Sequence, residues 1–251
     1  MTTSTPLEAQ VDLYCRELKL PGIRRVYREM ARDSLDKGLE PTQFLAACLA
    51  QELESRKERR LQNLLKYARF PVSKTLDTFD FTQIPSLPKA KVLKLAGGDF
   101  IRARENVICV GSTGTGKTHI AIALGMAAIQ ENYRVRFISA MQLSQELLQA
   151  QEELRLPRYL KTWAKVDLAI VDELGYLGLG TGGPLLFQFC AERYESGSLM
   201  MTTNLEFSRW GEVFGDATLT SALLDRLTHH VHVLSFNGES YRFRQSTQQN
   251  K

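Results

Sequence analysis

Apolar residues within the first 70 positions recur at helical spacing. Three stripes, at residues 23–31, 44–53 and 61–68, follow the three- and four-residue steps that are typical of amphipathic helices. Pro21-Gly22 and the segment from Gly38 to Pro41 separate the stripes, as turn-forming residues do. The pattern predicts a small all-α domain over residues 1–70.

Residues 71–88 show no sustained periodicity. Pro71, Pro85 and Pro88 fall within this stretch, and proline favours extended backbone over regular helix. We expect an extended linker here, placed so that it can lie along the domain that follows.

From residue 89 onward the rhythm changes to short β-rich runs that alternate with helical patterns. The helical patterns cover residues 117–131, 141–164, 184–196 and 219–229. The runs are Val107–Val110, Val135–Ser139, Leu168–Val171, Leu199–Thr203 and Val231–Phe236. Such alternation is typical of an α/β fold with a parallel sheet. We therefore expect a five-stranded α/β domain over residues 89–251.

Composition narrows the class of protein. The 251 residues carry 32 Lys and Arg against 28 Asp and Glu, a net charge of +4, and 43% are hydrophobic. These values exclude disordered, collagen-like and disulfide-scaffold chains, and the charge alone does not establish a nucleic-acid partner. The chain starts without an apolar leader, its four cysteines lack CxxC spacing, and its longest uncharged stretch, 174–191, is rich in glycine. We expect a cytoplasmic protein with reduced thiols and no membrane span.

The sharpest motif is a complete GxxxxGK[ST] phosphate-binding loop, or Walker A motif. It consists of Gly111, Ser112, Thr113, Gly114, Thr115, Gly116, Lys117 and Thr118. A predicted strand enters the loop and a predicted helix leaves it, which is the context that such loops require. The glycines let backbone N–H groups approach phosphate, Lys117 reaches the β- and γ-phosphates, and the Thr118 hydroxyl binds Mg²⁺. The cofactors expected are ATP and Mg²⁺.

Two further predicted strands end in polar residues. The run Leu168–Val171 is followed by Asp172 and Glu173. Ligands bind at the carboxyl ends of strands in open α/β sheets, so Asp172 is the candidate Mg²⁺ ligand and Glu173 the candidate general base. Asn204 follows the next such strand and could face the γ-phosphate or the attacking water. Its alternative role is to cap the turn that follows.

These motifs together resemble the AAA+ ATPases, within them the DnaC-like clade, and within that clade the IstB-like helper ATPases of bacterial insertion sequences. The similarity covers about residues 90–245, and the N-terminal helical segment also resembles that family. The most specific run is SRWGEVFGDATLTSALLDRLTHH, supported by LAIVDELGYL, FQFCAERYESGS and GESYRFR.

The resemblance implies a role for three polar residues. It places Asn204 at the sensor-1 position, Arg226 at the arginine-finger position that acts on a neighbouring subunit's ATP, and Arg242 at a candidate sensor-2 position. From pattern alone, either arginine could be an ordinary surface residue. The resemblance also implies ATP-driven assembly on DNA and a transposase partner. Because the chain ends soon after Arg242, we expect no separate lid domain.

Basic residues form two candidate DNA-binding groups. One comprises Arg155, Arg158, Lys161 and Lys165, whose spacing would place them near one face of a helix. The other lies in the helical domain and includes Arg56, Arg59 and Arg60. Cations gathered on one face contact phosphates, and no base-reading motif is present, so binding to duplex DNA should be largely independent of sequence. The alternative for each group is a solvated helix face.

The sequence therefore predicts an ATPase that oligomerises on duplex DNA and assists or regulates a transposase in engaging target DNA. A DnaC-like replicative helicase loader is the nearest alternative. A small-molecule P-loop kinase would need a substrate pocket and lid that the sequence does not indicate. A DNA-architectural protein that keeps ATP only as a structural ligand would not need Glu173 and Asn204.

Overall fold

A computed structural model describes residues 5–175, 182–194, 196–215, 220–221, 231–238 and 240. The chain forms two compact units, residues 1–63 and 64–251, and the boundary between them falls within helix α3. The helix expected over 219–229 lies almost wholly outside the described residues, as do Arg226 and Arg242.

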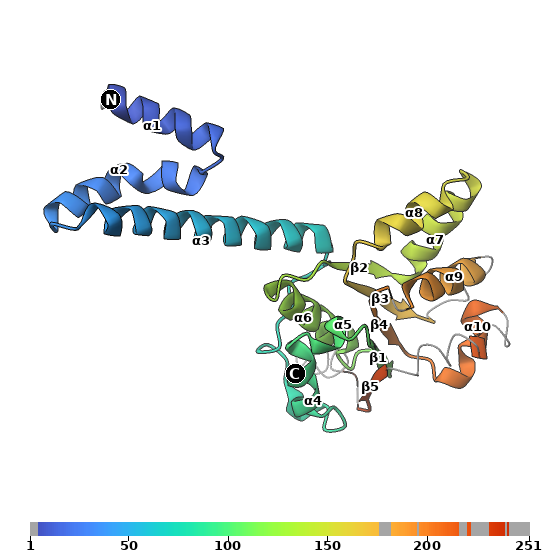
Figure 1. Cartoon of the computed structure of the whole chain (residues 1–251). Coiled ribbons are helices and arrows are strands. Elements are labelled where there is room, and N and C mark those ends of the chain that lie inside the picture. Colours follow the sequence, from blue (N-terminus) through green and yellow to red (C-terminus); the bar gives the residue numbers. More distant parts are fainter. Residues whose placement is uncertain are drawn as a thin grey trace, which may run out of the picture. The chain divides into compact units, whose positions relative to one another are not determined.

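The first unit is built from three helices, and α2 lies between the other two (Figure 1). They are α1 (Pro6–Glu17), α2 (Pro21–Asp36) and α3 (Pro41–Ala68). Each begins at a proline, which lacks the N–H that the first helical turn would leave unpaired. Thr5 and Glu8 add a capping box at the start of α1. Cys15, Tyr27 and Cys48 are buried between the helices.

A buried carboxylate fixes the start of α2. Glu52 of α3 is 3% exposed, and its Oε2 accepts hydrogen bonds from the N–H groups of Gly22 at 2.6 Å and Ile23 at 3.2 Å. Its Oε1 accepts from Arg56 Nε at 2.9 Å and lies 3.4 Å from Arg59 Nη2. Burial opposes ionisation of Glu52, but the Arg56 and backbone hydrogen bonds outweigh it and lower its pKa. Arg56 and Arg59, two of the arginines predicted to bind DNA, therefore also interact with Glu52 within the helical unit.

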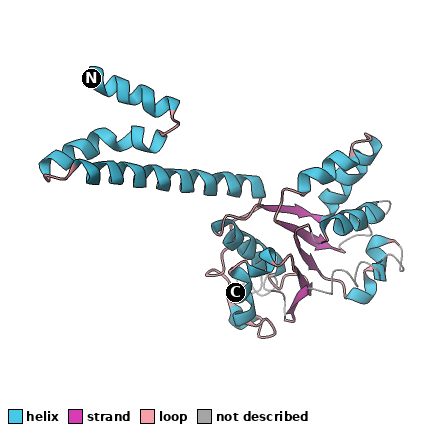
Figure 2. Cartoon of the chain, viewed as in Figure 1, coloured by secondary structure: helices cyan, strands magenta, loops and turns pink. Residues whose placement is uncertain are grey.

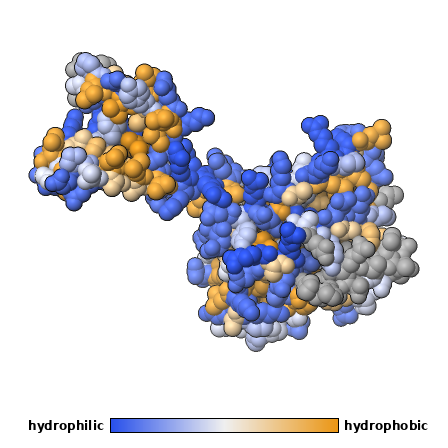
Figure 3. Space-filling view, viewed as in Figure 1, coloured by the Kyte–Doolittle hydropathy of each residue, from blue (hydrophilic) through white to orange (hydrophobic). Residues whose placement is uncertain are grey.

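The helical unit keeps many large apolar side chains at its surface, and orange atoms gather on it in Figure 3. These exposed side chains include Leu7, Leu18, Leu35, Leu45 and Leu53. Among the described helices of the whole chain, none is both long and apolar enough to cross a membrane.

The second unit contains a parallel five-stranded sheet in the order β2-β3-β4-β1-β5. The strands are β1 (Asn106–Gly111), β2 (Val135–Ser139), β3 (Leu168–Leu174), β4 (Ser198–Thr203) and β5 (Val231–Phe236). All five strands predicted from the β-rich runs are confirmed. Strands β3 and β1, which lead into the candidate acids and the phosphate loop, each flank β4, so the polar residues at their carboxyl ends share one edge of the sheet.

Helices cover both faces of this sheet (Figure 2). Helix α6 (Lys117–Gln130) contacts β1 to β4 on one face, and α4 (Lys89–Ala96) packs on α6. On the other face α7 (Ala140–Glu152) and α9 (Gly183–Arg193) contact the strands, and α8 (Leu156–Trp163) packs on α7. The short elements are η1 (Phe81–Gln83), α5 (Asp99–Arg102), η3 (Phe207–Arg209) and α10 (Gly211–Phe214).

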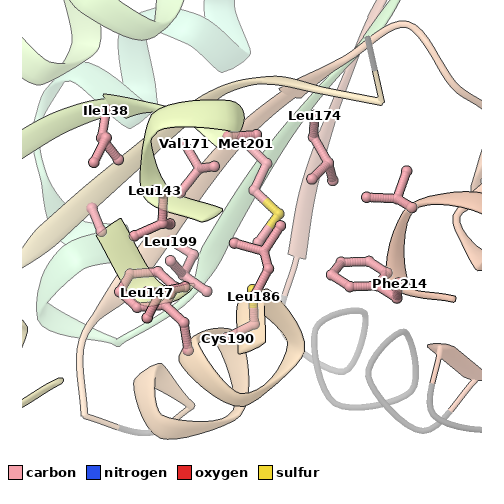
Figure 4. Close-up of a cluster of buried hydrophobic side chains, with 14 of the residues drawn as sticks. Ile138, Leu143, Leu147, Val171, Leu174, Leu186, Cys190, Leu199, Met201 and Phe214 are labelled. Atoms are coloured by element: carbon pink, nitrogen blue, oxygen red, sulfur yellow. The ribbon is translucent and has the colours of Figure 1, made fainter. Parts of the chain in front are cut away.

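A cluster of buried hydrophobic side chains lies between the sheet and helices α7 and α9 (Figure 4). Successive side chains of a strand point to opposite faces of the sheet. Val171 of β3 therefore belongs to this cluster, whereas Ile170 lies against α6. Trp163 and Trp210 are fully buried in it. Labelled members in Figure 4 include Leu143, Leu147, Leu186, Leu199 and Met201.

The single helical pattern expected over 141–164 is two helices. Helix α7 ends at Glu152, Leu154 adopts a positive φ of 53°, and α8 begins at Leu156 with Pro157 in its first turn. The prediction of one face carrying four cations is wrong for this reason. Arg155 precedes α8 at its N-cap and Lys165 follows its end, so only Arg158 and Lys161 lie within the helix.

A buried arginine fixes the end of α8. Arg193 of α9 is 2% exposed, and its Nη1 donates to the carbonyls of Trp163 and Val166 at 2.7 Å each. Its Nη2 donates to Ser198 O at 3.2 Å. Burial lowers the pKa of Arg193 to about 10, so the group is still charged at neutral pH. Its hydrogen bonds hold the segment from α8 to β3 against the start of β4.

Candidate nucleotide-binding site

The phosphate loop joins β1 to α6, as the motif predicted. Gly114 and Gly116 have positive φ values of 80° and 90°, which side chains on other residues would strain. Gly116 is the N-cap residue of α6, and the loop is braced by Thr115, whose hydroxyl donates to Ser112 O at 2.7 Å. The first N–H groups of α6 therefore open at the loop, where a helix N-terminus favours an anion.

Lys117 lies over this loop. Its Nζ donates to Gly111 O at 2.8 Å and to Ser112 O at 2.7 Å. These carbonyls hold the ammonium group beside the space that the loop encloses. A phosphate in that space would offer the same group a charged acceptor, which is a stronger partner than a neutral carbonyl.

The two candidate acids end up in different environments. Asp172 is 6% exposed, and the Thr118 hydroxyl lies 2.9 Å from its Oδ1 and 3.1 Å from its Oδ2. Glu173 is exposed and has a positive φ of 61°. The pairing of β3 with β4 shifts register between Val171 and Leu174, which turns Glu173 out of the regular ladder. One acid is thus packed beside the loop and the other opens to the cavity.

A threonine that the sequence reasoning missed connects these acids. Thr202 of β4 is 1% exposed; its hydroxyl donates to Asp172 Oδ1 at 2.6 Å and accepts from the Glu173 N–H at 2.9 Å. The available signal was a pair of hydroxyl residues at the end of an otherwise apolar strand. Asn204, two residues on, is exposed at the same edge.

A cavity of about 490 Å³ brings these groups together. Its walls include the phosphate loop with Lys117 and Thr118, the acid Glu173, and the end of β4 with Asn204. The remaining wall is formed by residues 72–84, which we call the strap. The sequence predicted a linker there but no part of it as a site. A cavity of this size is typical of small-molecule and cofactor sites.

The strap is tied to the helix that follows the phosphate loop. His119 Nε2 lies 2.9 Å from Thr75 O and 3.3 Å from Thr78 Oγ1. The Phe79 ring meets the His119 ring edge to face, with centroids 5.2 Å apart. A Cβ on Gly116 would stand 2.6 Å from Phe79, so the strap also needs glycine at the N-cap. His119 therefore packs against the strap.

The wall of the cavity carries both positive and negative side chains. Lys117 brings a positive group from the loop, and Asp80 brings a carboxylate from the strap. Hydrogen bonds from the Thr82 hydroxyl and N–H, and from Gln83, lower the pKa of Asp80 and keep it ionised at neutral pH. Behind the loop, burial raises the pKa of Cys109 to about 12, so that thiol is neutral.

The other predicted residues lie elsewhere. Arg158 and Lys161 are exposed on α8, and Arg60 is exposed on α3. Arg155 is exposed and forms an ion pair with Glu153. The structure does not place these cations in the cavity, and their role in binding DNA stays a prediction.

Comparison with known proteins identifies the family. A family model described as "IstB-like ATP binding protein" matches residues 14–249. The chain belongs to the IstB-like family. A relative named for insertion sequence IS5376 of Geobacillus stearothermophilus is 38% identical over 240 residues, which cover 95% of this chain and 96% of the relative. A relative named for IS21 of Pseudomonas aeruginosa is 38% identical over 237 residues, covering 94% and 89%. Both names assign the relatives to insertion sequences and to ATP binding.

Solved structures share the fold of the second unit. AMPPCP-bound DnaA from Aquifex aeolicus superposes with a TM-score of 0.55 at 20% identity, covering 70% of this IstB-family chain and 54% of DnaA. DnaI superposes with a TM-score of 0.51 at 15% identity, covering 66% and 89%. These likenesses establish a shared parallel five-stranded fold. The second unit of this IstB-like chain therefore has the fold of these structures.

Proposed function

We propose that this IstB-family protein hydrolyses ATP, assembles on duplex DNA, and assists or regulates a partner transposase in engaging target DNA. The observation that carries the proposal is the convergence of Lys117, Thr118 and Glu173 around one cavity, with Asp172 hydrogen-bonded to Thr118 beside it. The family adds the insertion-sequence context. A helicase loader would use the same ATP chemistry, but the match to insertion-sequence proteins over nearly the whole chain favours the transposition helper.

The residues beside the loop suit Mg²⁺. Thr118 and Asp172 place a hydroxyl and a carboxylate within 3.1 Å of each other, and Mg²⁺ prefers such oxygen ligands together with phosphate oxygens. Thr118 would hold the ion directly and Asp172 directly or through water. When bound, Mg²⁺ neutralises charge on the β- and γ-phosphates.

The remaining cavity residues would each have a separate role in hydrolysis. Lys117 binds the phosphates, and Glu173, open to the cavity, polarises the attacking water as general base. Asn204 holds that water or the γ-phosphate from the neighbouring strand. Because the loop takes the phosphates, the base and ribose go to the strap, whose wall includes Phe79 and Ile84.

Binding to DNA is proposed for cations outside the cavity. Arg158 and Lys161 are one helical turn apart on α8 and both are exposed, so they can reach adjacent phosphates. Arg155 and Lys165 flank them at the two ends of α8. Arg60 and the exposed parts of Arg56 and Arg59 offer further phosphate contacts from the helical unit.

Assembly is proposed to complete the ATP site. The family resemblance gives Arg226 the role of an arginine finger for a neighbouring subunit and Arg242 a sensor role. A finger supplied by a neighbour stabilises charge on the transferring phosphoryl group only when subunits meet. ATP would then couple turnover to homo-oligomerisation on DNA.

Phosphate release from ATP, measured with and without duplex DNA of unrelated sequences, tests this function. The helper should turn over ATP in water alone, without a small-molecule phosphoryl acceptor, and the rate should respond to each duplex to a similar extent. Tight ATP binding without turnover would point to a structural ATP ligand. Stimulation by a replicative helicase but not by duplex DNA or a transposase would favour the helicase loader.

A further inference from the structure

We propose that Thr202 is a positioning residue of the ATPase site, which holds Asp172 and Glu173 in their working arrangement through a single buried hydroxyl. The proposal rests on the proposed hydrolysis of ATP and adds a residue to it. Thr202 contacts the two acids, and acts through them.

The hydroxyl uses both of its hydrogen-bonding capacities on the acids. It donates its proton to Asp172 Oδ1 at 2.6 Å and accepts the Glu173 N–H at 2.9 Å. Thr202 is 1% exposed, so water does not replace either bond readily. A valine at this position would fill nearly the same volume and offer neither a donor nor an acceptor.

Glu173 needs such a partner because its backbone leaves the regular strand. Its φ is 61°, a region that residues other than glycine adopt rarely, and the β3–β4 register shifts between Val171 and Leu174. The Thr202 hydroxyl takes the Glu173 N–H at this shift, in place of a carbonyl of the ladder. The bond therefore selects the backbone conformation that turns the Glu173 side chain toward the cavity.

Asp172 is oriented by the same hydroxyl. Its Oδ1 receives Thr202 from one side and lies 2.9 Å from the Thr118 hydroxyl on the other. Thr202 thus fixes the rotation of a carboxylate that faces the phosphate loop. One side chain on β4 sets both the acid beside the loop and the acid that opens to the cavity.

The neighbouring threonine shows that this contact is specific. Thr203 is also 1% exposed, but its hydroxyl donates to Leu174 O at 2.7 Å and accepts from Leu205 N–H at 3.0 Å. It braces backbone on either side of the site, whereas Thr202 bonds to the acids themselves.

Thr202→Val and Thr202→Ser test the proposal, with Ser198→Ala as the matched control. Ser198 is fully buried at the other end of β4, and its hydroxyl lies near Phe100 O, away from the cavity. Each full-length variant is assayed for ATP affinity, kcat, KM and thermal midpoint. We expect Thr202→Val to lower kcat by about 10- to 100-fold, as misplacing a catalytic group does, with ATP affinity within about threefold. Thr202→Ser should restore most of kcat, and Ser198→Ala should leave it unchanged.

A double variant separates positioning from general damage. If Thr202 acts through Glu173, Thr202→Val should lose most of its effect on kcat in a Glu173→Gln background, whereas damage to the fold would multiply the two losses. If Thr202→Val does not bind ATP, Thr202→Ala takes its place, since it adds no methyl group beside Asp172.

Two results would overturn the proposal: a folded Thr202→Val protein with kcat within twofold of wild type, or a Thr202→Ser protein as slow as Thr202→Val. The single Glu173→Gln variant separates this failure from failure of the proposed function. If Glu173→Gln turns over at the wild-type rate, the assignment of the site to hydrolysis fails. If Glu173→Gln is slow and Thr202→Val is not, only the role of Thr202 fails.

Discussion

Replacing His119 with alanine should weaken nucleotide binding while leaving the hydrolytic groups in place. The substitution removes the contact of Nε2 with Thr75 O at 2.9 Å and the edge-to-face contact with the Phe79 ring. Both contacts hold the strap against the helix that follows the phosphate loop. The side chains of Asp172 and Glu173 make no described contact with His119.

The size of the effect follows from the aromatic contact and one hydrogen bond, since Nε2 lies closer to Thr75 O than to Thr78 Oγ1 at 3.3 Å. One hydrogen bond contributes about 0.5–1.5 kcal/mol and one aromatic pair a similar amount, so the strap loses roughly 1–3 kcal/mol of docking free energy. If ATP binds only when the strap is docked, and the strap of the variant is mostly undocked without ATP, this whole loss passes into the dissociation constant. It corresponds to a dissociation constant about 5- to 150-fold larger, with kcat at saturating ATP changed little.

A fluorescent ATP analogue titrated into the full-length protein measures this effect. His232→Ala is the matched control, because His232 on β5 pairs with Glu105 at 2.7 Å and does not line the cavity. His119→Ala should weaken binding and the control should not. Equal ATP affinity in wild type and His119→Ala would mean that the strap docked by His119 does not bind the nucleobase.

Three further predictions concern stability, DNA and assembly. Glu52→Gln should lower the free energy of unfolding by about 1–3 kcal/mol at pH 7, as measured by denaturant titration, since charged hydrogen bonds are lost. Because folding lowers the pKa of Glu52, its contribution to the free energy of unfolding is present above its unfolded pKa and disappears as pH falls through its folded pKa. The stabilities of the two proteins should therefore converge in acid, and a difference in stability that stays constant with pH would contradict this. The double variant Arg158→Ala, Lys161→Ala should bind duplex DNA more weakly, and the slope of log affinity against log salt concentration should fall by about 2, with ATP affinity unchanged. An unchanged slope would mean that α8 presents only a solvated face. Mixing Arg226→Ala with Lys117→Ala should recover some ATPase activity if sites are shared between subunits, and no gain despite verified co-assembly would argue against a shared site.

Local patterns predicted the parts of this protein that depend on neighbouring residues. The apolar runs gave all five strands, and the central strands β3 and β4 are buried at nearly every position, as parallel strands covered on both faces are. The motif from Gly111 to Thr118 gave the loop, and the positions of Asp172 and Asn204 after their strands placed both at the same edge of the sheet.

Features that depend on distant contacts were not predictable from such patterns. Thr202 meets Asp172 across 30 positions of sequence, and His119 meets Thr75 across 44. The two hydroxyl residues at the end of β4 mark a polar strand end, but the sequence near position 202 or position 119 does not identify the distant partner. The break between α7 and α8 comes from one residue with positive φ, Leu154, and its local signal in the sequence is Pro157, which lies in the first turn of α8.

A single-turnover experiment that compares wild type, Glu173→Gln and Lys117→Ala tests whether this cavity hydrolyses ATP. Each protein is mixed with radiolabelled ATP, Mg²⁺ and duplex DNA, and bound ATP and released phosphate are followed in the same samples. We expect Glu173→Gln to bind ATP like wild type but to release phosphate about 10²–10⁴-fold more slowly, whereas Lys117→Ala fails to bind ATP. Wild-type phosphate release by Glu173→Gln, or unchanged ATP binding and turnover by Lys117→Ala, would show that this cavity is not the site of hydrolysis.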